Sequence, residues 1–134
     1  MMDGCRMYTL EYKGDERGWL YSLPAESLLF LGEVNEMHLG AIEPDAIRGN
    51  HFHPNRKEVL LVQHQTQWEF LWQFPDEDEP HVESILGHGG VVIEILPGVV
   101  HTLRNTGTHS LIMAAFSNRA YVPDSDDTQR LILV

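Results

Sequence analysis

The sequence predicts an all-β fold, and three observations lead to it. Apolar residues fall in short alternating runs, as they do in strands that bury one face. Glycine, proline, asparagine and aspartate separate these runs, as turn residues do. A convincing helical period is absent. About ten short strands without helices imply a β-sandwich or a β-barrel.

The expected strands run along the chain in order, each bounded by turn residues. They are 8–12, 19–22, 28–31, 34–42, 47–53, 59–63, 67–74, 81–86, 91–95, 99–105 and 109–116. Single helical turns are expected at 24–27 and 124–128. The strand at 67–74 has the clearest period, because its aromatic residues fall on every second position. Core or dimer-interface packing is the simplest role for them, and a sugar-stacking platform is the alternative; they are Trp68, Phe70, Trp72 and Phe74.

Size and charge limit the partners that this chain can have. With 134 residues it is expected to be one domain, residues 1–134. Its net charge of −11 repels phosphate backbones, and no basic stripe offsets it, so nucleic acid is not an expected partner. No apolar run is long enough for a membrane span. The single cysteine and the absence of a secretory signal predict a cytoplasmic protein that does not associate with membranes.

Three histidines and a glutamate form the most informative pattern. His51 and His53 are two residues apart, so a strand would project both from one face. Glu58 follows after Pro54 and Asn55, which allow the chain to bend, and His101 comes from a distant strand. Three imidazoles and a carboxylate suit one divalent transition metal ion: zinc foremost, with iron, nickel and manganese also compatible.

This spacing resembles that of the cupins, which are small double-sheet jelly rolls. The first cupin motif corresponds to His51, His53 and Glu58, and the second to Gly90, Gly98, His101 and Asn105. Asp45 and Gln65 stand where the family usually has glycine. The resemblance implies a double-stranded β-helix over residues 31–134, preceded by N-terminal strands in residues 1–30 that match nothing we can name.

A narrower resemblance covers roughly the last two-thirds of the chain. Segments 47–53, 97–105 and 116–128 are similar to the C-terminal cupin domain of capsular-polysaccharide assembly enzymes, which act on nucleotide 4-keto sugars and carry zinc. Residues 48–52 are also similar to deoxysugar 3,5-epimerases and 3,4-ketoisomerases, where a histidine acts as base. This resemblance implies an isomerase or epimerase of nucleotide-linked keto-deoxysugars for surface polysaccharides. It also implies a small-molecule nucleotide-sugar substrate and a homodimer.

The sequence leaves the catalytic base open. If all three histidines bind a metal, the base must come from elsewhere, and the candidates are Glu69, Tyr121, His38 and His109. In a metal-free site, His51 or His53 would itself be the base.

Three residues are candidates for binding substrate: Arg48, Asn105 and Arg119. By strict parity Arg48 faces away from His51, which favours a structural ion pair, unless Gly49 hosts a bulge that turns it inward. Asn105 is alternatively a turn residue before Gly107.

Two other functions fit the same ligand set. One is an iron-dependent cupin dioxygenase, which oxygen consumption by iron-loaded protein would reveal. The other is a non-catalytic cupin that binds a sugar or another small molecule, which a thermal shift without turnover would reveal.

Overall fold

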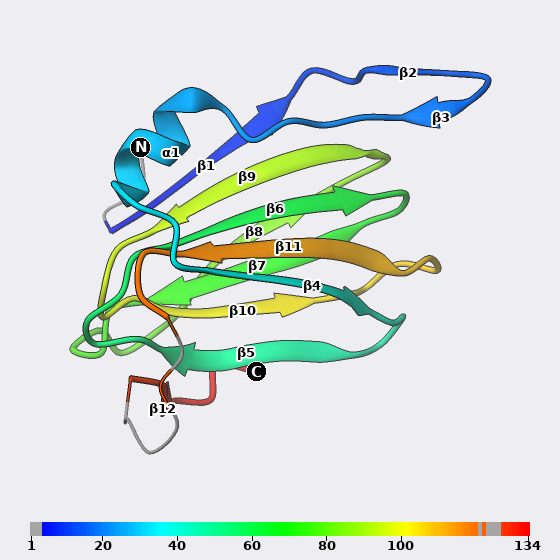
Figure 1. Ribbon diagram of the computed structural model, residues 1–134. Coiled ribbons are helices and arrows are strands. Elements are labelled where there is room, and N and C mark those ends of the chain that lie inside the picture. The colour runs from blue at the N-terminus through cyan, green and yellow to red at the C-terminus, as the bar shows by residue number, and fades with distance from the viewer. Residues whose placement is uncertain (1–3, 121, 123–126) are drawn as a thin grey trace.

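Two five-stranded antiparallel sheets face each other in the computed structural model, which describes residues 4–120, 122 and 127–134 (Figure 1). In spatial order, the first sheet is β1 (Cys5–Leu10), β9 (Gly89–Ile95), β6 (Glu58–His64), β11 (Leu111–Ser117) and β4 (Glu36–Ile42). The second is β12 (Gln129–Arg130), β5 (Ile47–Phe52), β10 (Val100–Arg104), β7 (Trp68–Gln73) and β8 (His81–Ile85). From β4 to β11 the chain alternates between the two sheets, except at the β7–β8 hairpin, and the expected double-stranded β-helix is confirmed.

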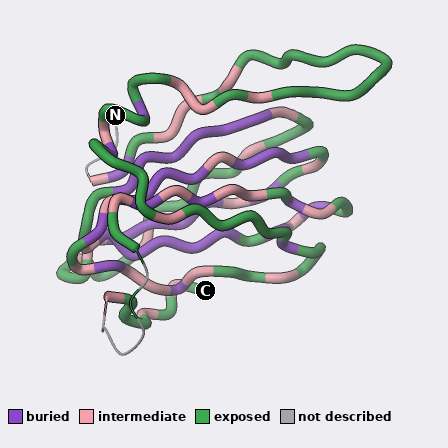
Figure 2. Tube along the Cα trace, viewed as in Figure 1, coloured by how far each residue is buried: buried purple, intermediate pink, exposed green. Residues whose placement is uncertain are grey.

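The core lies between the two sheets and is filled by the inward residues of their central strands (Figure 2). Trp68 and Phe70 on β7 are fully buried, and Trp72 is 6% exposed. Phe74, just past the strand, packs against the same cluster. The alternating aromatic residues of 67–74 are therefore core, and the alternatives of a dimer interface or a sugar platform are not needed.

The prediction of a strand at 28–31 is wrong, because that segment belongs to helix α1 (Ala25–Leu31). Pro24 is extended and starts the helix, and Gly32 ends it with a φ of 83°. The intervening alanine, glutamate and leucines favour helix. The end of α1 buries Leu31, which joins a second small core cluster with Val59 and Val92. None of the helices in the described part of the chain is long and apolar enough to cross a bilayer.

Other differences lie at the chain ends. A short hairpin, β2 (Gly14–Asp15) and β3 (Gly18–Trp19), projects beyond the sheets where one strand was expected at 19–22 (Figure 1). The expected helical turn at 124–128 falls mostly outside the described residues, and 127–128 are not helical. The chain instead ends with β12 paired to β5, which the sequence did not indicate.

The core position of Phe70 gives a stability prediction. Replacing Phe70 with alanine should lower the free energy of unfolding by about 3–5 kcal/mol, because it opens a cavity in the core. The change Val82→Ala on edge strand β8, where the valine is 50% exposed, should cost less than about 0.5 kcal/mol. Urea denaturation monitored by tryptophan fluorescence measures both, and similar costs for the two variants would contradict the proposed core.

Candidate functional site

A β-bulge in β5 sets up the site. The register between β5 and β10 steps from His51–His101 to Gly49–Thr102, so Asn50 is the extra residue. Gly49 has a φ of 112°, and a Cβ there would lie 2.5 Å from the His101 carbonyl oxygen. Only glycine fits this approach. Asn50 takes a φ of 56°, and Thr102 secures it: the Thr102 hydroxyl accepts from the Asn50 backbone N–H (2.9 Å) and donates to Asn50 Oδ1 (2.8 Å).

The bulge changes which side chains face inward. Arg48 lies opposite Leu103 and His51 lies opposite His101. Because Leu103 and His101 are two residues apart on β10, they share a face, and so do Arg48 and His51. Arg48 accordingly lines the same cavity as His51. The bulge that the sequence allowed at Gly49 is present. Strand parity therefore no longer places Arg48 on the face opposite His51.

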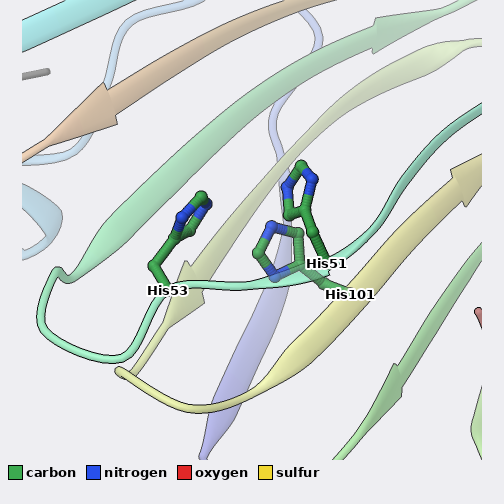
Figure 3. Close-up of side chains that lie close together, drawn as sticks. All are labelled: His51, His53 and His101. Carbon is green, nitrogen blue, oxygen red and sulfur yellow. The ribbon is translucent and has the colours of Figure 1, made fainter. Parts of the chain in front are cut away.

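Three imidazoles converge in the space between the sheets (Figure 3). One ring nitrogen from each of His51, His53 and His101 lies within 4.8 Å of the others. The Glu58 carboxylate, at the start of β6, joins them: its Oε1 is 3.1 Å from His101 Nε2 and its Oε2 is 3.5 Å from His53 Nε2. The fold therefore brings together the four residues that the sequence proposes as metal ligands.

Backbone carbonyls fix two of the rings. His53 Nδ1 lies 2.8 Å from the Asp127 carbonyl oxygen, and His101 Nδ1 lies 3.0 Å from that of Val99. A carbonyl only accepts, so each Nδ1 carries the proton and each Nε2 presents a lone pair. Both Nε2 atoms are buried without a hydrogen-bond partner among the described residues. Two buried lone pairs beside a carboxylate create a place for a cation.

The pKa shifts of these residues also favour a cation at this place. Burial, followed by the neighbouring imidazoles of His101 and His53, lowers the pKa of His51 to about 4, and burial also lowers that of His53. For Glu58, burial raises the pKa, but the contact with His101 Nε2 and the electrostatic interactions with the three histidines outweigh it and lower the pKa to about 2. No lysine or arginine of the described chain forms an ion pair with Glu58. A buried carboxylate beside histidine nitrogens suits a divalent metal.

A cavity of about 890 Å³ contains this cluster. Its lining includes residues of β4, which ends the first sheet, and of β5, which lies beside the short edge strand β12 of the second. Besides the four candidate ligands, its lining includes Arg48, His38 and Glu36. A volume of this size matches those of small-molecule and cofactor sites.

Comparison with known families decides which family this fold and site belong to. The family described as the polysaccharide biosynthesis C-terminal domain matches residues 13–129. The chain belongs to this family. No curated protein sequence matches the chain.

Solved structures of this fold include enzymes of nucleotide-sugar metabolism. The chain is similar to the 3,4-ketoisomerase QdtA from Thermoanaerobacterium thermosaccharolyticum, in a variant solved with TDP-4-keto-6-deoxyglucose (17% identity, TM-score 0.70, 97% of this chain and 89% of that one). It is also similar to the capsular polysaccharide assembling protein CapF from Staphylococcus aureus (22%, 0.64, 92% and 33%). A third is the epimerase RmlC from Legionella pneumophila, in complex with dTDP-4-keto-L-rhamnose (16%, 0.69, 92% and 71%). At these identities the likeness shows the shared fold, and this chain spans a third of CapF.

Among the described candidates for a base outside the histidine–glutamate cluster, His38 lines the cavity, whereas Glu69 and His109 do not. His38 lies on edge strand β4, and its Nε2 contacts the carboxylate of Glu36, two residues earlier on the same face. The Glu36 carboxylate also lies 3.8 Å from the buried guanidinium of Arg56. Sequence reasoning missed Glu36, although its two-residue spacing from His38 on an expected strand was a usable signal.

The other candidates lie elsewhere. Glu69 on β7 is 3.9 Å from Arg104 and does not line the cavity. Arg119 is exposed beyond β11, and His109 is exposed in the turn before that strand. Tyr121 lies outside the described residues.

Asn105 serves the turn that the sequence offered as its alternative role. Its Nδ2 donates to the carbonyls of Ile42 (2.9 Å) and His109 (2.8 Å), and its Oδ1 accepts from the Gly107 N–H (3.0 Å). The side chain is 1% exposed and does not line the cavity. It therefore braces the strand ends and is not placed to contact a ligand there.

The ligand geometry predicts how metal binding responds to mutation. Either His51→Ala or His101→Ala should reduce zinc content from about one ion per chain to a small fraction, since the remaining donors leave the coordination incomplete. The matched control His109→Ala removes an exposed imidazole and should retain the ion. Elemental analysis after dialysis measures the content, and circular dichroism checks the fold. Full retention of zinc in either site variant would contradict the assignment.

Proposed function

We propose that this chain is a metal-binding isomerase or epimerase of nucleotide-linked keto-deoxysugars that serves surface-polysaccharide synthesis. The observation that carries the proposal is that one cavity holds an inward arginine, an ionisable His38 and a histidine–carboxylate cluster. A nucleotide keto sugar needs a cation for its pyrophosphate and proton transfer at its ring. The family membership and the sugar nucleotides bound by QdtA and RmlC support the same substrate class.

The metal would be held by His51, His53, Glu58 and His101, and zinc suits these donors best. A divalent ion there would polarise the ketone oxygen and stabilise the negative charge that develops on it. The protein itself fixes the donors in advance, because the carbonyls of Val99 and Asp127 set the rings of two of them.

We assign proton transfer to His38. Its Nε2 contacts the Glu36 carboxylate, so that nitrogen carries a proton and Nδ1 is left as the acceptor. In the proposed step the ring C–H beside the ketone loses its proton to Nδ1 as the ketone becomes an enolate. Return of a proton from solvent to the opposite face of the same carbon would epimerise the sugar. Transfer of the neighbouring hydroxyl proton to the former ketone oxygen, with return of the proton from His38 to the carbon that bears that oxygen, would move the ketone.

Arg48 is the proposed contact for the pyrophosphate. It faces the cavity through the bulge, and it forms no ion pair with any acidic residue in the described ranges. A net charge of −11 repels an anionic substrate, so a local cation at the cavity is needed to hold it.

We also propose that the chain forms a homodimer. Met37 (64% exposed) and Leu39 (76% exposed) lie on β4, which is the last strand of its sheet. An exposed apolar edge strand favours pairing with a second copy.

Proton exchange tests the reaction. Metal-loaded protein incubated with a nucleotide 4-keto-6-deoxy sugar in D2O should introduce deuterium at the carbon beside the ketone, measured by mass spectrometry. His38→Asn should slow this exchange by about 10²–10⁴-fold, because it removes the base. His109→Asn is the matched control and should exchange normally.

The outcomes separate the parts of the proposal. Absence of exchange with several such sugars rejects the isomerase. Normal exchange in His38→Asn rejects only the assignment of His38 as the base. Exchange that survives metal removal but is lost in His51→Asn would assign the base to His51.

Substrate binding tests Arg48. Arg48→Ala should weaken binding of a nucleoside diphosphate by about 10–100-fold, because a charged hydrogen bond is worth about 1.5–3 kcal/mol. Arg104→Ala removes an exposed arginine at the end of β10 that lies near Glu69 and does not line the cavity, so this control should bind normally. Isothermal titration calorimetry with TDP measures both, and equal affinities in the two variants would exclude Arg48 as the phosphate contact.

A further inference from the structure

The C-terminal segment, residues 127–134, is docked along the outer edge of β5 (Figure 1). Strand β12 pairs with β5, and beyond it the contacts concentrate on Asn50 of the bulge. The Asn50 carbonyl accepts from the Leu131 N–H (2.9 Å), and its Oδ1 accepts from the Leu133 N–H (2.9 Å). Its Nδ2 donates to the Val134 carbonyl (3.1 Å). The segment is thus hydrogen-bonded to the strand that carries His51.

The beginning of the same segment contacts a candidate metal ligand. His53 Nδ1 donates to the Asp127 carbonyl at 2.8 Å, and the Thr128 hydroxyl lies 3.2 Å from the same nitrogen. These contacts hold the proton on Nδ1 and turn Nε2 towards Glu58. The ring of His53 is therefore oriented by residues far away in the sequence.

The Asp127 side chain holds this arrangement in place. Its Oδ1 accepts from the backbone N–H and from Nδ2 of Asn55, each at 3.0 Å, and its Oδ2 accepts from Arg56 Nε at 3.0 Å. Arg56 is only 6% exposed, so this ion pair is shielded from water. Asn55 and Arg56 belong to the loop that joins ligand His53 to ligand Glu58. One carboxylate thereby ties the C-terminal segment to that loop.

We infer that Asp127 is a positioning residue, and that the C-terminal segment completes the candidate metal centre by fixing the tautomer and orientation of His53. The inference rests on the proposed metal-binding function. Partners that orient a metal-binding histidine typically contribute 10–100-fold to metal affinity. A purely structural segment would change the stability of the fold and leave the tautomer of His53 and the metal affinity unchanged.

The test compares Asp127→Ala with Asp15→Ala in the full chain. Asp15 forms an exposed ion pair with Arg17 on the β2–β3 hairpin, far from the site in the fold, so its loss controls for removal of an Asp–Arg pair. Long-range ¹H–¹⁵N NMR of metal-free protein reports the tautomer of His53. Competition with a chromophoric chelator reports zinc affinity. Asp127→Ala should convert His53 from the Nδ1–H form to a mixture and weaken zinc binding by about 10–100-fold, and Asp15→Ala should change neither.

Two results would overturn the inference: an unchanged His53 tautomer in Asp127→Ala, or a zinc affinity within about twofold of the unmodified protein. Asp127→Asn keeps an acceptor for Asn55 but loses the charge opposite Arg56. Its zinc affinity should lie between those of the unmodified protein and Asp127→Ala. If the unmodified protein binds no zinc, the proposed metal centre fails, and the tautomer alone still decides whether Asp127 positions His53.

Discussion

The hydrogen bonds between Thr102 and Asn50 are the constraint on which the rest of the site depends. They hold Asn50 in a left-handed conformation that costs energy for a non-glycine residue. The extra residue shifts the phase of β5, so that Arg48 and His51 face the cavity together. The side chain of the same Asn50 also forms hydrogen bonds with the C-terminal segment. One bulge therefore decides both what lines the cavity and what docks outside it.

Electrostatics then determine what this cavity can hold. Burying the Glu58 carboxylate costs free energy unless a positive group compensates it, and burial lowers the pKa of the neighbouring His51 and His53. Two of the rings have their Nδ1 protons committed to carbonyls, which leaves lone pairs directed at the carboxylate. A cavity that concentrates acceptors in this way suits the metal cation that we propose. Arg48, in contrast, lines the same cavity with a positive charge that suits an anion, and the two together match a polar substrate with a charged end.

Local patterns in the sequence were enough for the fold and for the four residues that converge in the cavity. The two-residue period of Trp68, Phe70 and Trp72 identified a core strand, because burial follows parity in a sheet. The leucines after Pro24 led to the wrong prediction of a strand at 28–31. A short apolar run fits a strand or a helix equally, and only the residues at its ends distinguish the two. The inward turn of Arg48 needed the register of two strands, which a sequence does not contain. Sequence spacing placed Glu69 and His38 on equal terms, and only the fold put one of them in the cavity.

The contribution of the C-terminal segment shows why part of such a site escapes sequence reasoning. Asp127 acts on His53 mainly through a backbone carbonyl, and every residue type has one. Its carboxylate then matters because it anchors that carbonyl through Arg56 and Asn55, in a loop more than 70 positions away. The candidate metal centre consequently draws on β5, β6, β10 and the chain end, and it exists only when all four are assembled. Metal binding and docking of the chain end should therefore be thermodynamically linked, each strengthening the other.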